Sequence, residues 1–193
     1  MMFGSISAAR ESNIRRMIAF SSVAQIGYIY MGFGLGTAMG VLASIYHILS
    51  HAATKSLLFV SAAGLSESSA DSRELTELTG AGYRNPSAGM AFTVGALSMV
   101  GFPVFSGFIS KILFAQAAVN QPGKMLPTLI ALALSTILNV IYFMRAVIVI
   151  YTPLRDIPAE KREGYRKIRM RTHPEITAVF ACFVLLNLVL GLM

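Results

Sequence analysis

Gly101-Phe-Pro-Val-Phe-Ser-Gly107 lies in the middle of the longest apolar run of the chain, Pro86–Asn120, in which Lys111 is the only charged residue. The run has 35 residues, whereas a helix needs about 20 apolar residues to cross the hydrocarbon core of a bilayer. It is therefore long enough for two short crossings or for one long helix with a break. A proline and two glycines interrupt backbone hydrogen bonding, so we expect a break within this heptapeptide.

Four further runs flank this central run, and each is nearly free of charge. They are Met17–Leu35, Thr37–Leu65, Met125–Tyr151 and Ile176–Met193. Of the 193 residues, 55% are hydrophobic and 13% are charged, whereas an average soluble domain carries roughly 25% charged residues. These proportions exclude an ordinary soluble enzyme and a disordered chain. The sequence predicts an all-α, polytopic membrane protein with about five transmembrane helices.

The distribution of Lys and Arg decides between one and two crossings for the central run. With one crossing, three segments share a side of the membrane and carry twelve of these residues, against Lys124 alone on the other side. These segments are Arg10–Arg16, Ser66–Asn85 and Thr152–Pro174. With two crossings the bias disappears. Cytoplasmic loops carry an excess of Lys and Arg. We therefore expect one helix broken near Gly101–Gly107, with loops 10–16 and 152–174 on the cytoplasmic side of an inner or cytoplasmic membrane.

The same sorting explains the net charge of +7 without a nucleic-acid partner. The chain, residues 1–193, is expected to form one membrane domain. Residues 1–9 lack the basic lead-in and cleavage site of a secretory signal peptide, so we interpret them as the end of a preceding helix. The domain would then be the carboxyl-terminal part of a longer module.

Four ionisable residues lie deep inside the apolar runs. His47, His51 and Lys55 are spaced i, i+4 and i+8, which places them in a row about 12 Å long on one helix face. Lys111 lies four residues beyond Gly107. An ionisable side chain at that depth costs about 2.5–3.5 kcal/mol on insertion scales and normally marks a proton or ion path. Snorkelling to the interface explains Arg145, near the end of its run, but neither lysine.

A proton path suits these residue types. Loss of hydration disfavours an ammonium ion, so a buried lysine can release its proton when a neighbouring charge changes. Histidine titrates near neutral pH and can relay a proton between its two ring nitrogens. The row therefore predicts a proton conductor that meets Lys111 at the helix break.

Two other chemistries fit less well. His47 and His51 have the spacing of zinc ligands on one helix face, but no third His or carboxylate stands near them in the sequence. Cys182 is the single cysteine, which excludes a metal site with two thiolates. Ser21 and Ser22 could suggest a nucleophile, although serines in apolar helices more often bond to their own backbone.

Three motifs resemble signatures of one family. Asn13–Tyr28 reads NIRRMIAFSSVAQIGY and is similar to DIKRxxAYSSVxxxGY, and Tyr46–Phe59 reads YHILSHAATKSLLF and is similar to YHxxxHAxxKxLLF. Gly101–Lys111 reads GFPVFSGFISK and is similar to GxPxxxGFxxK. These are signatures of the antiporter-like subunits of respiratory complex I, membrane-bound hydrogenases and Mrp-type Na⁺/H⁺ antiporters. The motifs share the family's order and intervals, and the resemblance extends over essentially the whole chain, roughly the last five or six of fourteen helices.

The resemblance implies a role for each residue of the row. His47, His51 and Lys55 would lie on the family's central hydrophilic axis, and Lys111 would be the terminal lysine beside the exit half-channel. These subunits carry no flavin, iron–sulfur cluster or quinone pocket of their own, so the resemblance implies no cofactor and no catalytic or metal site.

Gln25 stands where some family members carry histidine, and with Ser21 and Ser22 it forms a candidate polar path. The chain departs from the family in one respect. The family's first half-channel, with its intramembrane glutamate and lysine, has no counterpart here, because no Asp or Glu lies in the five apolar runs.

The sequence thus predicts a proton- or Na⁺/H⁺-translocating subunit of a respiratory, hydrogenase or antiporter complex. It would couple ion movement to redox chemistry done elsewhere or exchange cations. Its expected partners are other membrane subunits, the lipid bilayer, H⁺ and Na⁺. Two alternatives remain at this point, a non-conducting assembly or anchor subunit (or a fragment of one) and a metal-dependent membrane enzyme.

Overall fold

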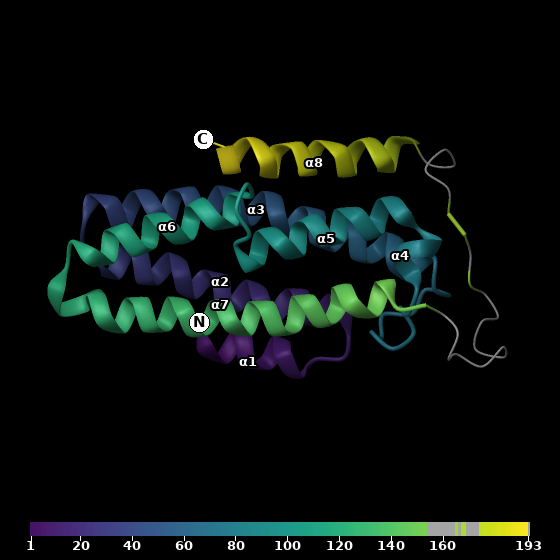
Figure 1. The fold of residues 1–193 in the computed structure, drawn as a ribbon, viewed down its shortest axis with the longest axis horizontal. Coiled ribbons are helices and arrows are strands. Elements are labelled where there is room, and N and C mark those ends of the chain that lie inside the picture. The colour runs from purple at the N-terminus through teal and green to yellow at the C-terminus, as the bar shows by residue number, and fades with distance from the viewer. Residues whose placement is uncertain (154–164, 166, 169–173, 193) are drawn as a thin grey trace.

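The computed structural model describes residues 1–153, 165, 167–168 and 174–192, and every regular element within them is a helix. The helices are α1 (Met2–Arg10), α2 (Ile14–Gly34), α3 (Ala38–Glu67), α4 (Ala81–Arg84), α5 (Pro86–Val100), α6 (Ser106–Val119), α7 (Pro122–Tyr151) and α8 (Pro174–Leu192). The long helices lie nearly parallel to one axis of the molecule (Figure 1). The predicted all-α membrane fold is confirmed.

Polar side chains just outside the apolar runs set where several helices begin. The Asn13 side chain accepts hydrogen bonds from the backbone N–H groups that open α2, and Thr37 does the same for α3. Asn85 caps α5, with Pro86 in the first helical position. A side chain that accepts these otherwise unpaired N–H groups stabilises a helix start by about 1 kcal/mol.

Four helices, α2, α3, α7 and α8, are long and apolar enough to cross a membrane on their own. The two shorter apolar helices, α5 with 15 residues and α6 with 14, follow one another along α3 (Figure 1). The central run is therefore one crossing in two halves, as predicted, and the break spans residues 101–105.

The break depends on backbone conformations that a regular helix lacks. Gly101 ends α5 with φ 89°, and Val104 has φ 83°, an unusual value for a β-branched residue. Gly107, in the first turn of α6, packs so closely on α5 that a Cβ there would overlap the carbonyl oxygen of Ser98. Glycine is therefore required at both ends of the break.

The loops sort by end as the single crossing requires. The α1–α2 turn, the end of α3, α4 and the ends of α7 and α8 that face the long connection share one end of the molecule (Figure 1). The α1–α2 turn and the segment between α3 and α4 are joined there by two backbone hydrogen bonds. The N–H of Ile14 donates to the Arg73 carbonyl and that of Leu75 to the Ser12 carbonyl, both over 2.9 Å. Lys124 is at the opposite end, where its ammonium donates to the Gly34 carbonyl, 2.8 Å away.

The predicted loop 152–174 falls largely outside the described residues. Arg145 extends towards the end of the molecule where the α1–α2 turn lies, and its guanidinium donates to the carbonyls of Ala9 and Glu11. Helix α1 does contact α2 and α7 as a helix, while the interpretation of residues 1–9 as the end of a longer helix stays a prediction.

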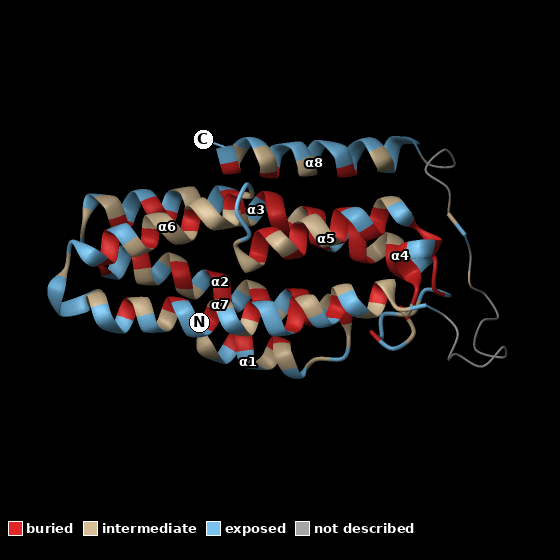
Figure 2. Cartoon of the chain, in the orientation of Figure 1, coloured by how far each residue is buried: buried red, intermediate tan, exposed pale blue. Residues whose placement is uncertain are grey.

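The interior between α2, α3, α5 and α7 holds the large buried side chains and a number of buried serines (Figure 2). Helix α8 lies at the outside of the bundle and is mostly exposed. Its buried residues, Phe180, Asn187 and Gly191, follow one face that turns towards α3, α5 and α6.

Candidate functional site

Three ionisable residues in the middle of α3, His47, His51 and Lys55, form the predicted row. Because α3 is continuous through this region, His47, His51 and Lys55 lie on one face of it. The imidazole rings of the two histidines stack with their centroids 6.0 Å apart and their planes within 14°. His47 and Lys55 retain only 6% and 7% of their accessible surface. His51 is half-buried, so the two ends of the row are held inside the protein and its middle is partly covered.

Lys55 is held by uncharged oxygen atoms of α2. Its ammonium donates to the carbonyl of Ile18, 2.7 Å away, and to the hydroxyl of Ser21. The aromatic ring of Phe143 in α7 lies 6.0 Å from the same nitrogen. No carboxylate of the described residues pairs with Lys55, so only neutral groups stabilise its positive charge.

Lys111 projects from the second half of the broken helix onto the end of the first half. Its ammonium donates to the carbonyl of Met99, 3.3 Å away, and to that of Val100. These residues lie in the last turn of α5, where helix carbonyls lack partners within their own helix and the helix dipole is negative. The break therefore supplies the acceptors that the buried cation needs.

A small cavity lies between the row and Lys111. It is lined by Gln25, His47, Ser50, His51, Thr54, Ser98, Met99, Gly107 and Lys111, and the volume open to the centre of a water molecule is about 10 Å³. Three nitrogen atoms of the lining residues are buried without a hydrogen-bond partner among the described residues, Nε2 of Gln25, Nε2 of His47 and Nδ1 of His51. Buried polar atoms of this kind are usually satisfied by water, and a polar space of this size suits about one molecule.

Hydroxyl groups surround the row on the side of the broken helix. Nδ1 of His47 lies 2.6 Å from the hydroxyl of Ser110 in α6. The Ser50 hydroxyl of α3 donates to that of Ser106 at the start of α6, 2.7 Å away. The hydroxyl of Tyr28, whose ring lies 5.4 Å from that of His47, is buried without a partner in the described part of the chain.

The three residues of the candidate polar path in α2 differ in what they contact. Ser21 contacts Lys55, and Gln25 lines the cavity. Ser22 is only half-buried and donates to the Ile18 carbonyl of its own helix, 3.3 Å away, so it contacts neither lysine. Of the three residues of this candidate path, only Ser21 and Gln25 therefore reach the row or its cavity.

Sequence reasoning missed Asn187 in α8. Its side chain is fully buried, and its oxygen accepts from three hydroxyl groups on three different helices. Asn187 is the only amide residue in the otherwise apolar run Ile176–Met193, which was the one signal available in the sequence.

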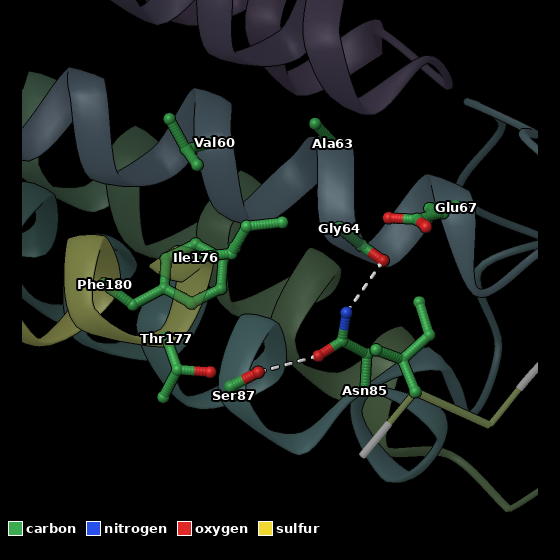
Figure 3. A pocket seen from close by; sticks show the side chains of 10 residues that line it. Val60, Ala63, Gly64, Glu67, Asn85, Ser87, Ile176, Thr177 and Phe180 are labelled. Carbon is green, nitrogen blue, oxygen red and sulfur yellow. Dashed lines mark hydrogen bonds between the residues drawn. The ribbon is translucent and has the colours of Figure 1, made fainter. Parts of the chain in front are cut away.

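A larger pocket lies elsewhere, at the end of α3 that faces α4 (Figure 3). Its volume open to water centres is about 170 Å³, and its wall combines apolar side chains such as Val60, Ile176 and Phe180 with Glu67 at the polar end. Asn85 closes one side by donating to the Gly64 carbonyl, 3.1 Å away. None of the predicted site residues lines this pocket.

Comparison with known proteins gives consistent relatives. The chain is 32% identical over 175 residues to NADH-quinone oxidoreductase subunit N of Desulforudis audaxviator, an alignment that covers 88% of this chain and 34% of that protein. Among solved structures, it matches a chain of the membrane-bound sulfane sulfur reductase, an archaeal respiratory membrane complex, with a TM-score of 0.82 and 27% identity over 98% of this chain and 36% of that one.

It also matches a chain of the Mrp complex from Dietzia sp. DQ12-45-1b, with a TM-score of 0.81 and 25% identity over 98% of this chain and 41% of that one. The chain spans about a third of the length of these relatives. The family model described as NADH:quinone oxidoreductase/Mrp antiporter, TM, matches residues 1–152, which include all three motifs, the row on α3 and the broken helix. On this match over most of its length, the chain belongs to the NADH:quinone oxidoreductase/Mrp antiporter transmembrane family.

Proposed function

We propose that the chain forms the part of a membrane complex through which protons move between the row on α3 and Lys111. One observation carries this proposal. Lys111 and both histidines line the same small cavity at the helix break, and one ring nitrogen of each histidine is buried without a hydrogen-bond partner in the described chain. A proton relay needs such free nitrogen atoms, whereas a purely structural polar cluster has its hydrogen bonds satisfied.

The relay would run from Lys55 through His51 and His47 to Lys111. An imidazole accepts a proton on one ring nitrogen and releases one from the other. The contact between Nδ1 of His47 and Ser110 leaves Nε2 as the nitrogen that faces the cavity. Ser110 can donate to Nδ1 or accept from it, so both tautomers of His47 keep that hydrogen bond. A water molecule in the cavity would connect Nε2 to the Lys111 amine.

The two lysines would hold the proton at either end of the relay. Among the described residues, the ammonium groups of Lys55 and Lys111 are held by neutral groups and by no carboxylate. Without a carboxylate partner, the balance between ammonium and amine responds strongly to an additional positive charge nearby. A proton on His51 would therefore favour deprotonation of Lys55, and a proton on His47 would act on Lys111 in the same way.

We propose H⁺ rather than Na⁺ as the ion handled at this site. Its members are nitrogen bases, which bind protons, whereas hard cations such as Na⁺ prefer clusters of oxygen ligands. The hydroxyls at the break lie within 2.7–3.3 Å of one another or of the Asn187 oxygen. These hydroxyls are therefore hydrogen-bonded to one another and to Asn187 and are not gathered around a common ion position.

The wider setting is part of the proposal. We infer that the chain works with the remainder of an antiporter-like subunit and with other membrane subunits, as the multi-subunit complexes among its structural neighbours suggest. Proton movement would be coupled to redox chemistry elsewhere in such a complex or exchanged for another cation. Loops 10–16 and 152–174 would face the cytoplasm at an inner or cytoplasmic membrane, since basic loops favour that side.

The test is proton transport by the assembled complex in sealed membrane vesicles. Lys111→Ala should abolish transport and leave assembly intact, because the side chain of this residue ends in the cavity and on the break. Lys124→Ala is the matched control, since Lys124 is a lysine of the opposite end that contacts only the Gly34 carbonyl, and it should transport normally. Normal transport by Lys111→Ala would refute the proposal and favour the non-conducting assembly subunit.

A further inference from the structure

Helix α8 contacts the helix break through a single polar side chain. Asn187 is the one buried polar residue among the described residues of α8. Its Oδ1 atom accepts hydrogen bonds from the hydroxyls of Thr54 in α3, 2.7 Å away, Ser98 in α5, 2.9 Å away, and Ser106 in α6, 3.0 Å away. One amide oxygen thus joins both halves of the broken helix to the helix that carries the ionisable row.

The orientation of the amide follows from its other contact. Nδ2 of Asn187 donates to the Phe183 carbonyl of α8, 3.1 Å away. Turning the amide over would place two carbonyl oxygens against each other, so Oδ1 must face the hydroxyls. Ser98 and Ser106 therefore direct their single protons at Asn187, while the oxygen of Ser106 accepts from Ser50 and that of Ser98 accepts from the Gly107 N–H. The Thr54 hydroxyl lies within reach of both Asn187 and the Ser50 carbonyl.

The last turn of α8 also covers the break itself. Gly191 packs so closely against the backbone of Val104 and Phe105 that a Cβ there would overlap the Val104 carbonyl. The residue before Gly191 is also held, because the Tyr46 hydroxyl of α3 donates to the carbonyl of Leu190. Val104, against which Gly191 packs, is the residue with the unfavourable positive φ. Strained backbone of this kind persists only where its surroundings fix it.

The contact with Ser98 connects Asn187 to Lys111. Ser98 immediately precedes Met99 and Val100, whose carbonyls accept from the Lys111 ammonium. Displacement of the end of α5 would therefore move both acceptors away from the cation. Asn187 reaches Lys111 only through this backbone and does not touch it.

We propose that Asn187 is a positioning residue for proton transfer. It fixes the end of α5 and the start of α6 against α3, so that the Met99 and Val100 carbonyls stay on Lys111. This inference rests on the proposed function. It adds to that function a role for α8, which carries no charged residue between Ile176 and Met193.

The experiment compares three substitutions in the assembled complex, with proton transport in vesicles and the amount of assembled complex as readouts. Asn187→Leu has a similar volume but no acceptor, and we expect transport to fall about tenfold with assembly unchanged. Asn187→Asp, which would be protonated at this buried position, keeps the shape and the acceptor oxygen and can donate its O–H to the Phe183 carbonyl, so it should retain most of the transport. Leu185→Ala, at an exposed position of the same helix, is the control for the effect of altering α8 and should behave like the wild type.

A second variant tests the placement of α8 on the break without changing the Asn187 amide. Gly191→Ala would push the last turn of α8 away from Val104 and should lower transport in the same direction as Asn187→Leu. Full transport by Asn187→Leu would overturn the inference, as would equal losses in the Leu and Asp variants, since these would indicate packing alone. Lys111→Ala, measured in parallel, separates the two proposals, because only its full activity contradicts the proton path itself.

Discussion

The ammonium of Lys111 lies 3.3 Å from the carbonyl oxygen of Met99, so the second half of the broken helix caps the C-terminal end of the first. The negative end of the α5 dipole and its last carbonyls, which lack partners within the helix, provide a partner for a positive charge without any carboxylate. The arrangement gives the break two tasks, because the interruption that frees the carbonyls also brings the lysine to them. It also suggests how to separate the charge of Lys111 from its ability to exchange a proton.

Lys111→Arg should keep the cap and abolish transport. Arginine remains protonated at any accessible pH, so it can accept from no donor and release no proton, while its guanidinium still donates to the Met99 and Val100 carbonyls. We expect wild-type assembly and a loss of transport of about 10²-fold or more, the range typical of removing a proton-transfer group. Transport is measured as the decay of a pH gradient in vesicles.

Lys124→Arg is the control for the same chemical change at the other end of the protein and should transport normally. If Lys111→Arg also transported at the wild-type rate, Lys111 would be a fixed charge at the break and not a proton carrier.

Gly107→Ala should destabilise the break. The added Cβ would overlap the Ser98 carbonyl, which is backbone and cannot rotate away, so α5 and α6 must separate. Overpacking of this kind costs about 1–3 kcal/mol. We expect a lower thermal unfolding temperature in detergent together with reduced transport.

Gly123→Ala is the matched control in the first turn of α7. A Cβ at Gly123 meets nothing within 4 Å, and alanine is favoured over glycine in helices by about 0.5–1 kcal/mol. Its unfolding temperature should stay the same or rise. Equal unfolding temperatures for the Gly107 and Gly123 variants would contradict the close packing of α6 on α5.

Much of this arrangement can be predicted because single residues of the sequence are energetically unfavourable inside a membrane. A lysine in an apolar run and a proline between glycines are each unfavourable in the hydrocarbon core. Lys55 and Lys111 therefore predicted the ionisable site, and Pro103 predicted the break. The sorting of basic residues then predicted that α5 and α6 form one crossing. In each case the physical reason lies within a single segment or in the side on which a loop falls.

The remaining features depend on which helices pack together. Ser21 and Ser22 are equivalent in the sequence, yet only Ser21 faces Lys55, because the face of α2 that packs on α3 is decided by tertiary contacts. Asn187 is likewise one polar residue in an apolar helix until α8 is placed across the break. Periodicity cannot identify its three hydroxyl partners, since they come from three other helices.

The adjacent serines of α2 provide the sharpest test of how Lys55 is held. Ser21→Ala removes one of the two oxygen acceptors of the Lys55 ammonium and leaves the Ile18 carbonyl in place. A hydrogen bond to a charged group contributes about 1.5–3 kcal/mol, so the protonated form of Lys55 becomes less favourable and proton transfer through it slows. We expect transport to fall by about tenfold, the change that 1.4 kcal/mol produces. Ser22→Ala, one residue further along the same helix, removes only a bond to its own backbone and should transport like the wild type. Equal rates for the two variants would show that Ser21 does not support the charge of Lys55.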